Sequence, residues 1–289
     1  MKMRIYRFSC IHKNFQILKF TVEQKIHYTL RIACAMCFIG HGSFGIIGKE
    51  IWTNYFAVFG IAHDTAFQLM PYVGAIDILC GIIILFYPIR AVIFWLVIWG
   101  MVTALLRPLS GEPYPEFIER AGNFGAPLAL LILSGGINFK NIFSPISPFV
   151  FPKEKAWSNL RLCLQFAAFL LLSGHGWLNL IDKSSLLGEY RLLGFDHPAQ
   201  TALVAGLFEI LAAISILIRP LRSAVLFFFI WKMAGELLYP HYELFEFIER
   251  GGSYGILLAL WFTLEINPVL KRKDERFFAT NFLMNSKRR

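Results

Sequence analysis

The chain has 289 residues, of which 56% are hydrophobic, 16% are aromatic and only 16% are charged. A soluble domain carries about 25% charged residues, so this composition excludes an ordinary water-soluble fold. Uncharged apolar runs long enough to cross a bilayer as a helix recur along the sequence, and crossing requires about 20 residues. The net charge of +9 therefore indicates membrane topology and attraction to anionic lipids, and no nucleic-acid partner is expected.

These runs predict an all-α polytopic membrane protein with eight transmembrane helices. A basic cytoplasmic leader (1–27) comes first, and a cytoplasmic linker (139–159) containing proline and lysine divides the spans into two groups of four. A basic cytoplasmic tail (268–289) follows the last span. The predicted spans are 28–48, 66–87, 89–108 and 121–138 in the first membrane unit (28–138), and 160–181, 199–218, 221–239 and 251–267 in the second (160–267).

Lysine and arginine are distributed unevenly between the two sides that this topology creates. Most of the 28 Lys and Arg residues fall in the leader, the linker, the tail and the turns at Arg90 and Arg219. Loops rich in lysine and arginine remain in the cytoplasm. Both termini are therefore expected in the cytoplasm, with the protein in a bacterial inner membrane.

The second half of the sequence repeats the first. The Gly-His-Gly sequence at 40–42 recurs at 174–176, and the EFIER sequence at 116–120 recurs at 246–250. Four spans are an even number, so both units begin on the same side and are predicted to be parallel repeats, unlike the inverted repeats of many transporters. The aligned pairs that matter for chemistry are His41 with His175, Asp77 with Glu209, Trp99 with Trp231, Glu119 with Glu249 and Arg120 with Arg250.

Three features of each unit are shared with a known family: a His-Gly pair in the first span, an acidic G-x-x-[DE]-[IL]-L motif in the second, and a short Pro/Arg turn after it. Through them the chain resembles the DoxX-like membrane proteins over both units, as a tandem member. The resemblance implies quinone-dependent oxidation or a redox stress response. Many members carry a lysine where this chain has Gly45 and Asn179, so lysine-dependent chemistry is not carried over.

Ionisable side chains inside the bilayer are costly and are candidates for function. His41 and His175 could tie neighbouring helices together, could bind a substrate or quinone, or could ligate haem or a metal. Asp77 and Glu209 lie at a depth that makes these histidines their expected partners. Such carboxylates could relay protons or simply lock the helices together, and all four side chains are predicted catalytic residues.

The EFIER sequences provide the predicted cofactor-binding residues. Their glutamates suit the start of a helix, where a carboxylate interacts favourably with the dipole. Arg120 and Arg250 could pair with acids of their own motif or could anchor an anionic or carbonyl group. The predicted cofactor-binding set is Arg120, Arg250, Glu119, Glu249, Trp99 and Trp231.

Two further patterns are compatible with chemistry or with packing. Cys34 and Cys37 have the spacing of a C-x-x-C redox motif, which on a continuous helix also places two small residues on one face. His63 and His197 lie 22 residues after the span histidines, which is not a spacing typical of metal ligands, and no metal site is predicted.

Three functions are therefore expected in turn. The first is a redox-linked membrane protein that binds a quinone-like or other amphipathic molecule, possible as a subunit of a quinone-linked oxidoreductase. The second is a small-molecule transporter with its path between the two repeats, marked by broken helices and a polar cavity on the axis. The third is a non-catalytic subunit that assembles with other membrane proteins, marked by a tightly packed interior.

Overall fold

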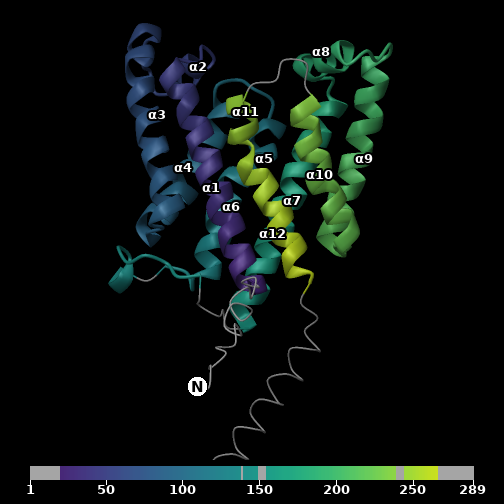
Figure 1. The fold of residues 1–289 in the computed structure, drawn as a ribbon. Coiled ribbons are helices and arrows are strands. Elements are labelled where there is room, and N and C mark those ends of the chain that lie inside the picture. Colours follow the sequence, from purple (N-terminus) through teal and green to yellow (C-terminus); the bar gives the residue numbers. More distant parts are fainter. Residues whose placement is uncertain (1–19, 138, 149–153, 239–243, 266–289) are drawn as a thin grey trace, which may run out of the picture.

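A computed structural model describes residues 20–137, 139–148, 154–238 and 244–265 (Figure 1). The described residues form helices and no β-strand, which confirms the all-α prediction. Five of these helices are long and apolar enough to cross a membrane. They are α1 (Val22–Ile47), α3 (His63–Phe86), α4 (Arg90–Leu109), α7 (Glu154–Leu180) and α9 (Pro198–Ile218).

The remaining helices are shorter, and two of the predicted spans are divided at an arginine. The helix expected at 121–138 is α6, which ends at Leu133 and is separated by Arg120 from the five-residue α5. The helix expected at 251–267 is likewise α12, separated from α11 by Arg250. The shorter elements are α2 (Trp52–Ala57), α5 (Pro115–Glu119), α6 (Ala121–Leu133), η1 (Phe139–Asn141), α8 (Ser184–Leu192), α10 (Arg222–Leu238), α11 (Leu244–Glu249) and α12 (Gly251–Thr263).

Several helices begin earlier than the hydropathy pattern predicts. Helix α1 begins inside the expected leader because Thr21 forms a capping box with Gln24, in which each side chain accepts a hydrogen bond from the other residue's backbone N–H. Such caps satisfy the free N–H groups of a first turn. Helix α7 begins at Glu154, inside the expected linker, because charged residues can extend a helix beyond its apolar part.

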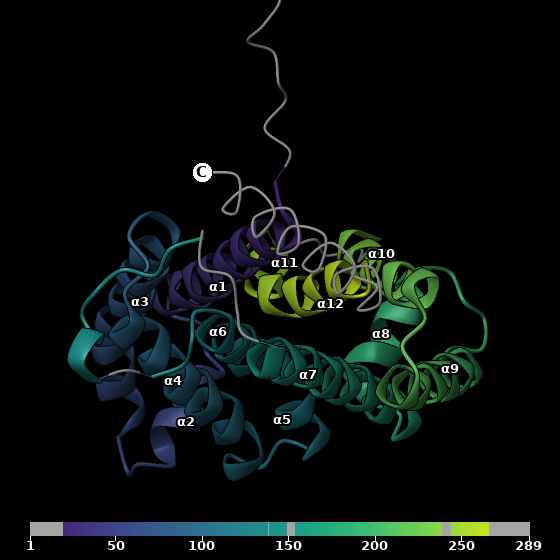
Figure 2. The ribbon, with the colours of Figure 1, turned by 90° about the horizontal axis from the view of Figure 1, so that it is seen from below.

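The molecule has a central group of helices with a lobe on each side. Seen from below, α1, α6, α7 and α12 lie in the middle, α2, α3 and α4 on one side, and α8, α9 and α10 on the other (Figure 2). In the centre, α6 and α12 approach so closely that a Cβ on Gly122 would lie 2.5 Å from the backbone nitrogen of Ser253. Small residues permit this approach between membrane helices.

The central helices are packed across the two halves of the chain. A Cβ on Gly40 of α1 would lie 2.3 Å from the backbone nitrogen of Glu249, and a Cβ on Gly174 of α7 would lie 2.3 Å from that of Glu119. Each glycine thus receives the end of a short helix from the other half. The contact places both EFIER sequences beside the histidines that follow these glycines.

Glycine contacts also align the first two long helices in each half. Gly42 of α1 faces Gly74 of α3, and Gly176 of α7 faces Gly206 of α9, with backbone close enough to exclude a Cβ in either pair. Asp77 and Glu209 lie three residues after Gly74 and Gly206, almost one helical turn. This register brings each acid level with the histidine next to the facing glycine.

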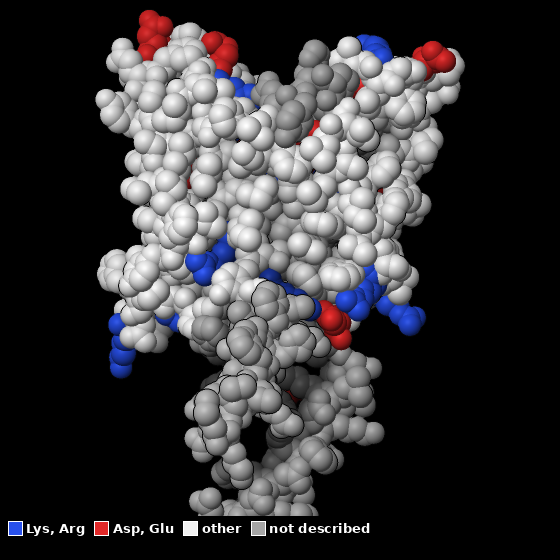
Figure 3. All heavy atoms as spheres, in the orientation of Figure 1, with Lys and Arg blue, Asp and Glu red and all other residues white. Residues whose placement is uncertain are grey.

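The surface has the features expected beside lipid. Large apolar side chains project outward from the lateral helices, including Ile76 and Leu79 on α3 and Leu211 and Ile218 on α9. On the face in Figure 3, lysine and arginine gather mainly toward the lower end, whereas acidic residues gather mainly toward the upper end. The first described helix begins and the last one ends at that lower end (Figure 1).

Candidate functional site

The two histidines of the Gly-His-Gly sequences each pair with the acid expected from its depth. His41 Nδ1 lies 2.8 Å from Asp77 Oδ2, and His175 Nδ1 lies 2.5 Å from Glu209 Oε2. Both acids are almost completely buried. A buried carboxylate needs such a partner, because removing a charge from water is costly without one. The predicted pairing is confirmed in both halves.

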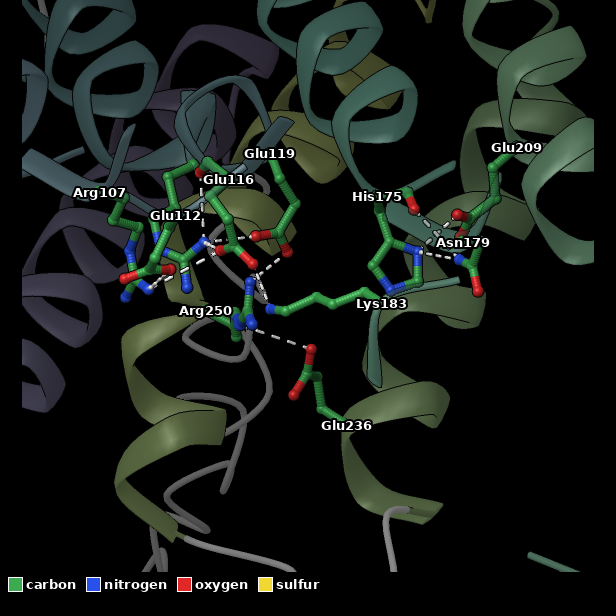
Figure 4. A network of polar contacts seen from close by, with 11 residues as sticks. Arg107, Glu112, Glu116, Glu119, His175, Asn179, Lys183, Glu209, Glu236 and Arg250 are labelled. Carbon is green, nitrogen blue, oxygen red and sulfur yellow. Dashed lines mark hydrogen bonds and ion pairs between the residues drawn. The ribbon is translucent and has the colours of Figure 1, made fainter. Parts of the chain in front are cut away.

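The pair in the second half belongs to a longer chain of hydrogen bonds. Trp231 Nε1 donates to Glu209 Oε1 at 3.0 Å. Asn179 donates to the backbone oxygen of His175 at 3.1 Å and accepts from the hydroxyl of Tyr190 at 2.8 Å. Figure 4 shows His175, Asn179 and Glu209 pointing toward one another. Both oxygens of Glu209 are therefore occupied by protein groups.

A cavity of about 120 Å³ lies beside the pair in the first half, with His41 in its wall. Apolar cavities of about 150 Å³ bind benzene-sized molecules, so the space suits one aromatic ring. The aromatic part of the wall consists of Trp52, Tyr55, Phe56, Phe59 and Trp99, and the charged or amide part consists of His41, Arg107, Arg120, Asn123 and Glu249. The Trp52 ring lies against His41, with centroids 4.5 Å apart.

A network of ion pairs begins at one side of this cavity. Arg120 contacts Glu116 at 2.5 Å and Glu119 at 2.8 Å. Arg107 contacts Glu112 at 3.1 Å and Glu116 at 3.7 Å. The expected pairing of Arg120 with the acids of its own motif is thus confirmed, and both arginines hold part of their charge toward the cavity wall.

The same network joins the two halves of the chain. Lys183 pairs with Glu116, and Arg250 pairs with Glu119 (Figure 4). In the aligned positions, Lys49 Nζ lies 2.9 Å from Glu246 Oε1. Arg250 therefore bonds an acid of the first EFIER sequence, whereas the sequence suggested an acid of its own. The swapped packing at Gly40 and Gly174 explains this exchange of partners.

The acids of the network are ionised in the folded protein. Burial opposes ionisation of Glu119, but Arg250 and Arg120 outweigh it and hold the pKa of this carboxyl well below its ordinary value. Burial likewise opposes ionisation of Glu116 and Glu249, yet nearby positive charges, chiefly Arg120 and His41 respectively, lower the pKa of each. Favourable charge partners can exceed a desolvation penalty in this way.

The predicted site residues separate into two groups. His41, Trp99, Arg120 and Glu249 line the cavity, and Asp77 bonds His41 from behind. The remaining predicted residues bond to one another instead, as the pairs described above: His175, Glu209 and Trp231 in one group, and Glu119 and Arg250 in the other. The sequence-aligned residues therefore do not form two alike cavities.

Several lining residues were not predicted from the sequence. Arg107 and Asn123 contribute polar groups, and Trp52, Tyr55 and Phe56 contribute aromatic walls. The aromatic-rich segment 52–59 was a usable signal, because such a density of rings in a short connection is unusual. Arg107 was a weaker signal, as one of few cations on its predicted side of the membrane.

The remaining candidate residues have structural surroundings. Cys34 and Cys37 are free and buried in the apolar core of α1, which favours packing over redox exchange. His63 is exposed and contacts Glu50 at 2.9 Å, and His197 is exposed at the start of α9. Within the described ranges, no group of three or more metal-ligating side chains gathers.

No family model, curated protein or solved structure matches the chain.

Proposed function

We propose that the chain is an integral membrane protein that binds one quinone-like, amphipathic molecule in the cavity beside His41 and takes part in quinone-linked redox chemistry. The observation that carries the proposal is the composition of this cavity. One wall is aromatic, and the opposite wall combines two arginines with a histidine that is bonded to a buried acid. Ligand pockets typically combine apolar walls with a few such convergent polar groups.

The lining residues have complementary roles toward a ring that carries oxygens. Trp52 and Phe56 would stack on or border the ring, while Arg107 and Arg120 can only donate hydrogen bonds and so suit carbonyl oxygens. Asp77 occupies Nδ1 of His41, which leaves Nε2 for the ligand. The His41–Asp77 pair is then the proton acceptor when a ring hydroxyl gives up its proton.

We further propose the topology in which this site operates. Eight spans in two parallel four-span repeats agree with the glycine contacts that recur in both halves, and with the motifs shared with DoxX-like proteins. Cytoplasmic termini in a bacterial inner membrane agree with the lysine and arginine near the lower end (Figure 3). The cavity then lies toward the outer leaflet, and the chain serves as a subunit of a quinone-linked oxidoreductase.

A transporter is the second candidate, because one of its expected marks is present. The helices at Arg120 and Arg250 are broken, as discontinuous helices are at many transport sites. The other mark is a polar cavity on the axis. The space between Arg120 and Arg250 is too small for a water molecule, and Gly122 and Gly252 close the contact beside it. Binding in the lateral cavity is therefore preferred.

The test is direct analysis of the purified protein. Its absorbance spectrum and an organic extract of the preparation are expected to contain a quinone, and a short-chain benzoquinone is expected to bind with one ligand per chain. His41→Ala is expected to weaken this binding at least tenfold, whereas His175→Ala, if folded, retains it. A quinone-free preparation that binds no benzoquinone would contradict the proposal.

A further inference from the structure

The carboxylates aligned at Asp77 and Glu209 satisfy their surroundings differently. Glu209 accepts from His175 through one oxygen and from Trp231 through the other. Asp77 bonds His41 through Oδ2, but Oδ1 has no partner among the described residues. The aligned tryptophan, Trp99, likewise has a buried Nε1 with no partner in the described ranges. The acid–tryptophan bond of the second half is thus unmade in the first.

Side-chain length explains the missing bond. Aspartate is shorter than glutamate by one methylene, which shortens its reach by about 1.5 Å. Added to the 3.0 Å between Trp231 Nε1 and Glu209 Oε1, this leaves a gap that one oxygen atom can bridge with two hydrogen bonds. An unpaired buried donor and an unpaired buried acceptor are both unfavourable, so a group that completes both has a built place.

The surroundings differ between the halves in the same sense. In the first half, Trp99 and His41 line the cavity. In the second, Tyr190 and Asn179 bond toward His175, and Tyr190 aligns with a cavity residue. The residues aligned with Trp52, Tyr55, Phe56 and Phe59 are Leu186, Glu189, Tyr190 and Leu193, so one of the four aromatic rings is kept.

We propose that the ligand binds through a hydroxyl group placed between Trp99 Nε1 and Asp77 Oδ1, and that the second half is a closed counterpart in which Glu209 makes this bond itself. The proposal rests on the proposed function and narrows it to the hydroxyl-bearing, quinol or phenol, form of the ring. The hydroxyl oxygen accepts from Trp99, and the hydroxyl hydrogen is donated to Asp77. A ring with only carbonyl or ether oxygens can satisfy Trp99 but not Asp77.

The experiment compares two probes with wild-type protein and with two reciprocal variants. The probes are a short-chain benzoquinol, held reduced under argon, and its di-O-methyl ether, which lacks the hydroxyl hydrogens. The wild type is expected to bind one quinol per chain, about tenfold more tightly than the ether. Asp77→Glu is expected to lose about tenfold in quinol affinity and to lose the preference, because the longer acid bonds Trp99. Glu209→Asp is expected to keep both.

The outcomes separate this inference from the proposed function. Equal affinity of the wild type for quinol and ether, or two quinols per chain, overturns the inference and leaves the proposed function standing. Binding of neither probe overturns both. Thermal denaturation without ligand verifies that each variant folds, and Asp77→Glu is expected to raise the midpoint. If Asp77→Glu fails to fold, the comparison of quinol with ether on the wild type still decides.

Discussion

Glu119, the last acid of the first EFIER sequence, is bonded by Arg250, the last residue of the second. The exchange is possible because each EFIER sequence ends against a glycine of the opposite half, Gly174 or Gly40. The repeated motif therefore functions as a clasp between the halves as well as a wall of the cavity. Arg120 has both duties, since it bonds Glu119 and lines the cavity.

Removing the charge of Glu119 is expected to destabilise the protein strongly. Glu119→Gln leaves Arg250 and Arg120 without their shared carboxylate, and breaking a buried ion pair from one side costs about 3 kcal/mol or more. The matched control is Glu246→Gln, which removes a half-exposed partner of Lys49 and is expected to cost at most about 1 kcal/mol. Thermal denaturation in detergent measures both, and equal losses would contradict the clasp.

The clasp also predicts how stability depends on pH. Glu116 and Glu119 have a pKa below the ordinary value of 4.5 in the folded protein. Their contribution is therefore complete above pH 4.5 and is lost as the pH falls through the lower folded-state values. The melting temperature is expected to fall steeply below pH 4.5, and less steeply in Glu119→Gln. Identical acid profiles for the two proteins would contradict this assignment.

Gly40 is expected to tolerate no side chain. In Gly40→Ala the new Cβ would meet the backbone of Glu249, which cannot move independently of its helix. Overpacking of this kind costs about 1–3 kcal/mol and would also displace Glu249 from the cavity wall. The control is Gly235→Ala, whose Cβ would meet no described atom within 4 Å. Both a lower melting temperature and weaker benzoquinone binding are expected for Gly40→Ala alone.

Trp52 is expected to contribute to binding through its ring. Trp52→Leu removes the ring beside His41, and the aligned residue of the second half is already Leu186. Loss of aromatic contact should weaken benzoquinone binding by about 1.4 kcal/mol, which is tenfold. Trp177→Leu is the control, because Trp177 is half exposed on α7 and lies outside the cavity. Fluorescence titration of both variants would refute the role of Trp52 if their affinities were equal.

Much of the helical architecture could be predicted from the sequence, because hydropathy and charge directly reflect the bilayer. The pairing of His41 with Asp77 could also be predicted, since depth along a helix follows from residue number. The break at Arg120 could not, because no proline or charge run marks it. Contacts between halves, such as Arg250 with Glu119, depend on how helices pack and are not encoded in local spacing.

The difference between the two halves was the least predictable feature. Asp77 and Glu209 are equivalent in any alignment, yet a single methylene decides whether the acid reaches its tryptophan. The cavity in turn depends on rings of a connecting segment, at Trp52 and Phe56, which lies outside the repeated motifs. Such features arise from packing in three dimensions.

The most direct test of the central claim is photolabelling with an azido-benzoquinone, followed by peptide mapping. The label is expected on the segments that form the cavity wall, 52–61 and 99–107, and excess benzoquinol should suppress it. Labelling spread over the outward faces of α3 and α9 that is unaffected by competitor, or centred on the aligned segment 186–195, would contradict the account.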